Sequence, residues 1–180
     1  MIIRAAGNSI IGLGHLMRTM SMASHMQGDS QVVYMCSDRE SCRCVEDRGF
    51  RAIELGADPF SREEVARILE ETKKNNLDNR ILIDSYLIND DYLEALGESF
   101  RVAMMYDLIE KAYPADLVIN YNLYASSEKY VDLDQNNNRE CPKIIAGSTY
   151  APVRPEFFRQ SRSDDYGVTD VLITVGGSDS

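Results

Sequence analysis

The sequence predicts an α/β fold, in which helices cover both faces of a parallel β-sheet. Short apolar runs alternate along the chain with stretches of helical periodicity, which is the pattern of repeated strand–helix–strand units. Polar residues or glycines directly follow several of these runs, as they do where the carboxyl edge of a parallel sheet binds a ligand. The 180 residues are enough for one hydrophobic core.

The individual elements follow from the apolar pattern and from the residues that interrupt it. Strands are expected at residues 2–5, 31–36, 50–54, 80–84, 100–106, 116–120 and 170–175, and helices at residues 14–26, 39–48, 61–75 and 90–97. Ser61 and Glu64 have the spacing of a capping box, in which the hydroxyl and the carboxylate each accept from a backbone N–H. Residues 120–139 are rich in Asn, Asp and Ser and are expected to form a surface loop.

The end of the chain indicates a second domain. Residues 1–150 are expected to form the domain that carries the site, residues 151–169 an interdomain linker, and residues 170–180 the first strand of a following domain. A strand closed by Gly176 and Gly177 is typical of the start of a unit, so we expect the chain to be part of a longer protein.

Charge and composition argue against several classes of function. The formal net charge of −10 disfavours binding to nucleic acid or to an anionic membrane surface, since both require basic surface. No apolar run approaches the roughly 20 residues that span a bilayer. The first residues do not have the order of a signal peptide. The sequence therefore predicts a cytoplasmic protein without membrane insertion.

The cysteines do not have the pattern of a metal site. Cys42 and Cys44 are too close for a zinc knuckle, and neither a second cysteine pair nor a nearby histidine completes one. Cys36 ends an apolar run and is expected to pack as a small core residue. No carboxylate–histidine cluster stands out either, so the sequence predicts no metal ion and no cofactor.

Gly12 and Gly14 precede His15 in a glycine-rich turn that opens the first helix. Glycine lets the backbone turn sharply and approach a ligand closely. The free N–H groups and the positive dipole end of the helix favour an anion here and disfavour a protonated imidazole. We therefore expect His15 to be neutral and suited to act as a general base. Arg18 lies on the same helix face and can hold a phosphate or carboxylate beside it.

Two other interpretations of this turn remain open. A histidine at a helix start can serve only as a cap or a solvent contact, and His25, near the end of the same helix, is expected to be structural. Gly12 and Gly14, with Asp38 after the second strand, also resemble a dinucleotide-binding pattern, but Met17 stands where the third glycine is required. Binding of NAD is therefore the less favoured interpretation.

Further polar residues lie where strands are expected to end. Because these positions share the carboxyl edge of the sheet, their side chains are candidates for a site; they are Asn8, Asp38, residues 84–86, Asp107 and residues 120–124. The Asp84 carboxylate could orient a hydroxyl group or a water, and the Tyr86 phenol can donate or accept a hydrogen bond. Alternatively, Asp84 caps the next element and Tyr86 packs against it.

Several segments, in the same order, resemble a known family. Residues 11–18, Ile-Gly-Leu-Gly-His-Leu-Met-Arg, resemble the IGxGHxxR signature of the UDP-sugar hydrolases of the pseudaminic acid pathway and of their spore-coat polysaccharide relatives. Residues 83–86 resemble the Asp-x-Tyr that ends a strand in this family, and residues 116–124 resemble its D-x-x-x-N-x-N-x-Y segment. Residues 146–157 resemble its linker, and residues 171–179 the strand that opens its second domain.

The resemblance implies a glycosyltransferase-B architecture, in which this chain is the N-terminal, Rossmann-like domain and a C-terminal domain, in cis, binds UDP. Family members hydrolyse UDP-2,4-diacetamido-2,4,6-trideoxy-β-L-altropyranose by attack of water at the anomeric carbon, with inversion, in nonulosonic acid or surface polysaccharide biosynthesis. On this basis His15 would activate the water, Tyr86 would lie near the sugar and Asp84 would support it. The resemblance also implies substrate contacts from Asn8, Gly12, Gly14, Arg18, Asn120, Asn122 and Tyr124.

The sequence departs from the family at two positions. Ala6 stands where an Asp or a similar polar residue is usual, and Ser85 replaces a histidine that some members have. Two alternatives to a hydrolase remain, because the same fold serves glycosyltransferases that transfer a sugar to a polysaccharide acceptor and also non-catalytic sugar-nucleotide-binding domains. Without the UDP-binding domain, the isolated chain is expected to be inactive.

Overall fold

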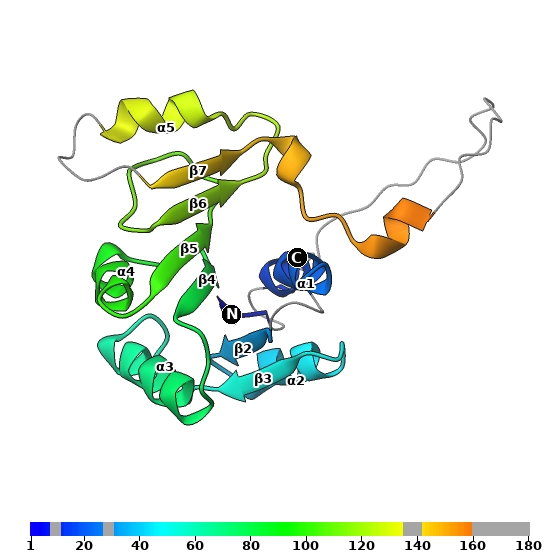
Figure 1. Cartoon of the computed structure of the whole chain (residues 1–180), viewed down its shortest axis with the longest axis vertical. Helices are drawn as coiled ribbons and strands as arrows, with labels where there is room; N and C mark the ends of the chain where they lie inside the picture. The colour runs from blue at the N-terminus through cyan, green and yellow to red at the C-terminus, as the bar shows by residue number, and fades with distance from the viewer. Residues whose placement is uncertain (8–11, 27–30, 135–141, 160–180) are drawn as a thin grey trace.

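A seven-stranded parallel sheet with helices on both faces forms the centre of the molecule (Figure 1). The computed structural model describes residues 1–7, 12–26, 31–134 and 142–159. The strand order is β3-β2-β1-β4-β5-β6-β7, which is the order of a Rossmann-like sheet extended by one strand. The predicted fold class is therefore confirmed.

The strands are short, and most of them coincide with the predicted apolar runs. They are β1 (Ile2–Ala5), β2 (Val33–Cys36), β3 (Arg51–Glu54), β4 (Arg80–Asp84), β5 (Arg101–Met105), β6 (Leu117–Asn120) and β7 (Lys143–Ala146). All residues of β1 and β2 are buried, because helices cover this part of the sheet on both sides.

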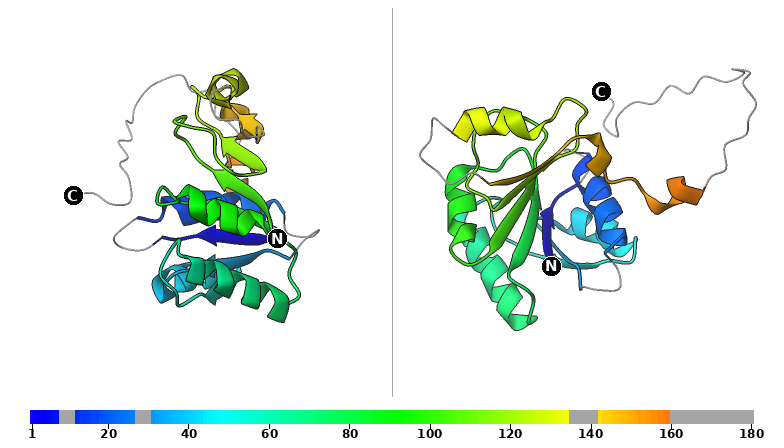
Figure 2. Two further views of the ribbon diagram at one scale, coloured as in Figure 1. Left: turned by 90° about the vertical axis from the view of Figure 1, so that its left-hand side faces the viewer. Right: turned by 45° about the horizontal axis from the view of Figure 1, so that its top comes forward.

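The helices divide between the two faces of the sheet. They are α1 (Gly14–Ser24), α2 (Arg39–Glu46), α3 (Arg62–Lys74), α4 (Asp90–Gly97) and α5 (Ser127–Asp134), followed by short 3-10 helices at Ser148–Tyr150 and Pro155–Arg159. α1 and α2 pack on one face, and α3, α4 and α5 pack on the other (Figure 2). None of the helices in the described part of the chain is long and apolar enough to cross a membrane.

The structure differs from the sequence-based expectation between residues 127 and 146. The prediction of a surface loop is wrong at α5, and β7 lies where no strand is expected. α5 is rich in polar residues, yet it anchors on the sheet through Tyr130, which is only 3% exposed and accepts a hydrogen bond from Asn120. A hydrophobic stripe was therefore not needed to place this helix. The strand expected at residues 170–175 lies outside the described residues.

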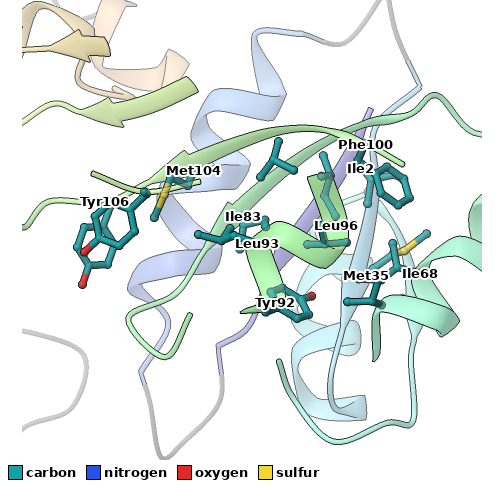
Figure 3. Packing of buried hydrophobic residues seen from close by; sticks show 14 of the residues in the cluster. Ile2, Met35, Ile68, Ile83, Tyr92, Leu93, Leu96, Phe100, Met104 and Tyr106 are labelled. Atoms are coloured by element: carbon teal, nitrogen blue, oxygen red, sulfur yellow. The ribbon is translucent and has the colours of Figure 1, made fainter. Parts of the chain in front are cut away.

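The hydrophobic core has one cluster on each face of the sheet. Figure 3 shows the cluster beneath α3 and α4, where Ile83 of β4 and Met104 of β5 pack against Leu93 and Leu96 of α4. The cluster on the other face includes Leu16 of α1. Each fully buried aliphatic side chain of this kind stabilises the fold by about 1.5–3 kcal/mol relative to exposure.

A buried ion pair lies within the cluster beneath α3 and α4. Arg4 of β1 is 1% exposed, and its Nε and Nη2 donate to the Glu64 carboxylate at 2.7 and 2.9 Å. The Tyr92 hydroxyl donates to the same carboxylate at 2.5 Å. Because each buried charge has an opposite charge in contact, the pair links β1, α3 and α4 without leaving a lone ion in the core.

Of the two hydrogen bonds predicted for the capping box at the start of α3, the structure contains one. The Ser61 hydroxyl accepts from the Glu64 N–H at 3.1 Å, as predicted. The expected return bond is wrong, since the Ser61 N–H donates to the Asp58 carbonyl and the Glu64 carboxylate accepts from the Phe60 N–H. The carboxylate turns toward the core because the Arg4 guanidinium lies there.

From β1 the strands that follow in sequence are added on one side of the sheet, and from β4 they are added on the other side. The boundary between β1 and β4 is therefore the place where a ligand site is expected. β1 pairs with β2 on one side and with β4 on the other, so the connections after β1 and after β4 leave the sheet on opposite faces. In such sheets ligands bind in the crevice outside the carboxyl ends of these two strands. The glycine-rich turn follows β1, and Asp84 ends β4.

Candidate active site

α1 begins at Gly14, directly after the glycine-rich turn, as the sequence predicts. Gly12 has a φ of 76°, a conformation that favours glycine. Gly14, in contrast, is helical, and a Cβ there would meet nothing within 4 Å. The turn therefore depends on Gly12, and Gly14 leaves open space at the helix start. Leu13, at the N-cap, supplies no side-chain hydrogen bond to the first N–H groups of α1.

Gly7 brings α1 close to the end of β1. A Cβ at this position would lie 2.9 Å from the Leu16 side chain, which is fully buried. The Gly7 N–H donates to the Ser41 hydroxyl at 3.1 Å, and this hydroxyl lies 3.2 Å from the Gly7 carbonyl oxygen. The close packing against Leu16 and the contact with Ser41 together fix where the first turn of α1 lies.

His15, Arg18 and Asp84 form a compact hydrogen-bonded group. Asp84 is fully buried at the end of β4, and its Oδ1 lies 2.7 Å from His15 Nδ1. Arg18 Nε donates to Asp84 Oδ2 at 2.5 Å, and Arg18 Nη2 donates to Asp84 Oδ1. Burial alone would lower the pKa of Arg18, but the hydrogen bonds to Asp84 outweigh this effect and raise it. Arg18 is thus a permanent cation that compensates the Asp84 charge.

This arrangement determines which nitrogen of the imidazole carries the proton. A carboxylate paired with a guanidinium only accepts hydrogen bonds, so His15 Nδ1 donates to Asp84. Arg18 Nη2 also lies 3.1 Å from Nδ1, but it has a closer acceptor in Asp84 Oδ1. In the neutral imidazole this leaves the lone pair on Nε2, for which the described residues offer no hydrogen-bond partner. This tautomer is the one in which Nε2 could act as a general base.

A cavity of about 280 Å³ adjoins this group. Its lining residues come from the ends of β1 and β4 and from α1: Ala6, His15, Asp84, Ser85, Tyr86 and Leu87. The Tyr86 ring stands edge-on to the His15 imidazole, with the ring centroids 5.0 Å apart. Burial, together with the hydrogen bond to Asp107, raises the pKa of Tyr86 to about 12, so the phenol is neutral. The cavity thus combines an imidazole, a phenol and apolar walls.

The residues after β6 that were predicted to bind substrate form a hydrogen-bonded turn. Asn120 is 1% exposed, and its Nδ2 donates to the Tyr130 hydroxyl at 2.9 Å. Its Oδ1 accepts from the Asn122 N–H at 3.1 Å. Asn122 Nδ2 donates to the Tyr124 hydroxyl at 3.3 Å, and that hydroxyl donates to the Asp107 carbonyl. In this structure Asn120 shapes the turn, while the half-exposed Tyr124 reaches toward Asp107.

Asp107 and Tyr121 complete the group around Arg18. Asp107 Oδ2 accepts from the Tyr86 hydroxyl at 2.5 Å and lies 3.7 Å from Arg18 Nη1. The Tyr121 hydroxyl accepts from Arg18 at 3.2 Å. The sequence signals Asp107 only as a polar residue after a strand. Tyr121 lies within the polar segment 120–124 that follows a strand, but the sequence does not signal its contact with Arg18, which joins residues 103 positions apart.

The remaining candidates lie elsewhere or outside the described residues, as Asn8 does. His25 lies at the other end of α1, where its Nε2 is 3.0 Å from the Val153 carbonyl oxygen. Asp38 accepts from the Ser41 N–H at 2.8 Å and so caps α2, whereas a dinucleotide site would use this carboxylate for the ribose. Within the described ranges, no group of three or more His, Cys, Asp or Glu residues could hold a metal ion.

Comparison with known proteins gives distant relatives, and no family model matches the chain. The chain is 26% identical over 180 residues to the UDP-2,4-diacetamido-2,4,6-trideoxy-beta-L-altropyranose hydrolase of Campylobacter jejuni, an alignment that covers 99% of this chain and 60% of that protein. It is 23% identical over 183 residues to the uncharacterized protein MJ1062 of Methanocaldococcus jannaschii, covering 96% of this chain and 36% of that protein.

Among solved structures, the NAD(P)-binding domain of an exopolyphosphatase-related protein from Archaeoglobus fulgidus aligns with a TM-score of 0.36 and 17% identity. That alignment covers 81% of this chain and 86% of the other. The chain spans about 60% of the length of the Campylobacter protein and about 36% of that of the Methanocaldococcus protein. This protein is therefore, over nearly its whole sequence, a distant relative of a protein named as a UDP-sugar hydrolase.

Proposed function

We propose that this chain forms the sugar-side half of a nucleotide-sugar hydrolase in which His15 activates the attacking water. The proposed substrate is a UDP-2,4-diacetamido-2,4,6-trideoxyhexose, and the proposed products are UDP and the free sugar. The reaction would belong to nonulosonic acid or surface polysaccharide biosynthesis in the cytoplasm. Support comes from the Campylobacter relative and from the motifs around His15 and Asp84.

The observation that carries the proposal is the contact between Asp84 and His15 at the edge of the cavity. Asp84 Oδ1 lies 2.7 Å from His15 Nδ1, and the bidentate contact with Arg18 fixes the carboxylate in turn. A base oriented by a buried carboxylate is the arrangement that hydrolytic enzymes of unrelated folds use to activate a nucleophile. Here it lies where parallel sheets of this order bind their ligands.

In the proposed reaction, the oxygen of a water attacks the anomeric carbon while the bond from that carbon to the phosphate oxygen breaks. The water proton passes to His15 Nε2, and the bonding electrons leave with UDP. Asp84 stabilises the imidazolium that forms, because its carboxylate already accepts from Nδ1. Tyr86, whose phenol proton is donated to Asp107, keeps oxygen lone pairs that can accept a hydrogen bond from the sugar.

The negative charge that develops on the leaving diphosphate needs a positive field. Both Arg18 and the N-terminus of α1 are candidates for this role, but the Arg18 guanidinium contacts Asp84 and Tyr121, and the side chain is only 14% exposed. We therefore assign the role to the N-terminus of α1, whose first turn contains no acidic residue and whose N-cap side chain makes no bond to it. Arg18 then acts by holding Asp84 in place.

The uridine would be bound by residues other than those described here, as the resemblance to two-domain hydrolases implies. The test is to incubate the intact protein with the UDP-sugar in ¹⁸O-labelled water, without an acceptor. We expect stoichiometric UDP release, with the label on the anomeric carbon of the free sugar. Absence of UDP release would refute hydrolysis and favour a transferase. Label in the phosphate of UDP would refute attack at the carbon.

A further inference from the structure

Asp107 follows β5 and lies between two side chains of the candidate site, Tyr86 and Arg18. Its Oδ2 accepts from the Tyr86 hydroxyl at 2.5 Å and lies 3.7 Å from Arg18 Nη1. Its Oδ1 is buried and has no hydrogen-bond partner among the described residues. A buried, unpaired carboxylate oxygen is unfavourable for folding, so a residue that carries one needs an explanation beyond stability.

We propose that Asp107 is a positioning residue of this site, which fixes the Tyr86 side chain over His15 through the Tyr86 hydroxyl. The inference rests on the proposed function, since the step that it serves is the proposed hydrolysis. Tyr86 is 48% exposed and lies after the end of β4, so packing alone does not hold its ring in place. The bond to Asp107 anchors the ring at its far end.

The anchored ring has two effects on the cavity. It stands edge-on to the imidazole with centroids 5.0 Å apart, so it limits how far His15 can rotate away from Asp84. It also forms one wall of the cavity, so its position sets the space beside the His15 side chain. A loosened ring would leave the base and the water less well aligned, which lowers the rate more than it weakens binding.

The side chain and the backbone of Asp107 contact different tyrosines. The Tyr124 hydroxyl donates to the Asp107 backbone carbonyl, whereas the Tyr86 hydroxyl donates to the carboxylate. A change from Asp107 to Asn keeps the backbone contact and the size of the side chain, and removes the charge that Tyr86 faces. Because Arg18 Nη1 also faces this charge, the effect on Tyr86 is separated from the effect on Arg18 by combining the substitution with Tyr86→Phe.

The first test is a double-mutant cycle on the intact protein with Asp107→Asn and Tyr86→Phe. Asp107→Asn is expected to lower kcat about tenfold with a smaller change in KM, a size typical of residues in direct contact. In a Tyr86→Phe background the same change is expected to have no further effect, because the hydroxyl is already absent. An undiminished effect in that background would overturn the inference. The matched control is Asp78→Asn, which removes a carboxylate that pairs with Arg80 at the exposed start of β4. This control should leave kcat unchanged.

The second test reports on Tyr86 without any need for activity. The protein is labelled with 3-fluorotyrosine, and the ¹⁹F resonance that disappears in Tyr86→Phe is assigned to Tyr86. Asp107→Asn is expected to lower the pKa of this phenol by about one unit, because a neighbouring negative charge is lost. An unchanged titration would overturn the inference even if activity fell. A shifted titration in a protein whose wild type releases no UDP would support the link and refute the proposed function instead.

Discussion

Asp84 Oδ1 lies 2.7 Å from His15 Nδ1, although the two residues are 69 positions apart in the sequence. β1 and β4 are neighbours in the sheet, so the helix that follows β1 starts beside the residue that ends β4. The contact therefore results from the strand order. It directs His15 Nδ1 at a buried carboxylate, which is the arrangement that the proposed mechanism uses.

Substitution of Asp84 by Asn is expected to abolish most hydrolysis by the intact protein. An amide at this position can donate to Nδ1 and so stabilise the wrong imidazole tautomer, which lowers kcat by about 10²- to 10⁴-fold in comparable triads. The change also leaves the Arg18 charge without its carboxylate, so the free energy of unfolding should fall by about 3 kcal/mol. UDP release and urea unfolding measure the two effects, and retention of wild-type kcat would contradict the assigned role.

The two glycines of the turn are expected to respond differently to alanine. Gly12→Ala should lower the free energy of unfolding by about 1–2 kcal/mol, because alanine is strained at a φ of 76°. Gly14→Ala should change it by less than about 0.5 kcal/mol, since the new Cβ meets no atom within 4 Å. If the diphosphate binds at this helix end, Gly14→Ala should raise KM. An unchanged KM would show that the open space at Gly14 is not a ligand site. A large loss of stability in Gly14→Ala would show that the space is not open.

The buried Arg4–Glu64 pair is expected to matter more for stability than an exposed pair of the same type. Glu64→Gln should lower the free energy of unfolding by about 3 kcal/mol, because it leaves the buried Arg4 charge uncompensated. Glu46→Gln is the matched control, since Glu46 and Arg39 are both largely exposed and the change should stay within about 0.5 kcal/mol. Urea denaturation of both variants gives the comparison. Equal effects would mean that Glu64 is not the buried partner of Arg4.

Alkaline pH is expected to destabilise the fold through Tyr92. Burial, followed by the Glu64 charge, raises the pKa of Tyr92 above its unfolded value of about 10. The resulting stability is complete below about pH 10 and is lost above it, since the unfolded state then releases its proton first. The free energy of unfolding should therefore fall above pH 10, by up to about 1.4 kcal/mol per pH unit from this residue. Tyr92→Phe should reduce that slope, and an identical slope in both proteins would contradict the assignment.

The sequence predicts most of the sheet because β1, β2 and β4 are mostly apolar and, apart from the exposed Arg80 at the start of β4, are buried on both faces. It does not predict β7, a four-residue edge strand whose first residue is an exposed lysine. α5 is missed for a similar reason, because its attachment depends on Tyr130 meeting Asn120 and not on a local apolar pattern. Long-range pairing decides both elements, and the surrounding sequence carries little sign of it.

The candidate site is predictable where one short segment carries the chemistry. The turn before His15 and the carboxylate at Asp84 can both be recognised locally. The partner of Arg18 cannot, because a guanidinium three residues after a histidine fits a phosphate or a carboxylate equally well. Only the packing of β4 beside β1 shows that Asp84 takes it. Asp107 and Tyr121 meet Arg18 because β5 and β6, which they follow, continue the sheet beyond β4.

The most direct test of the central claim is UDP release by His15→Asn in the intact protein, measured beside His25→Asn. His25 lies at the far end of α1 and contacts the Val153 carbonyl, so its substitution controls for loss of a histidine from the same helix. The proposal predicts that His15→Asn lowers kcat by at least about 10²-fold, the size typical of a lost general base, while His25→Asn retains wild-type activity. Undiminished turnover in His15→Asn would contradict the proposed mechanism.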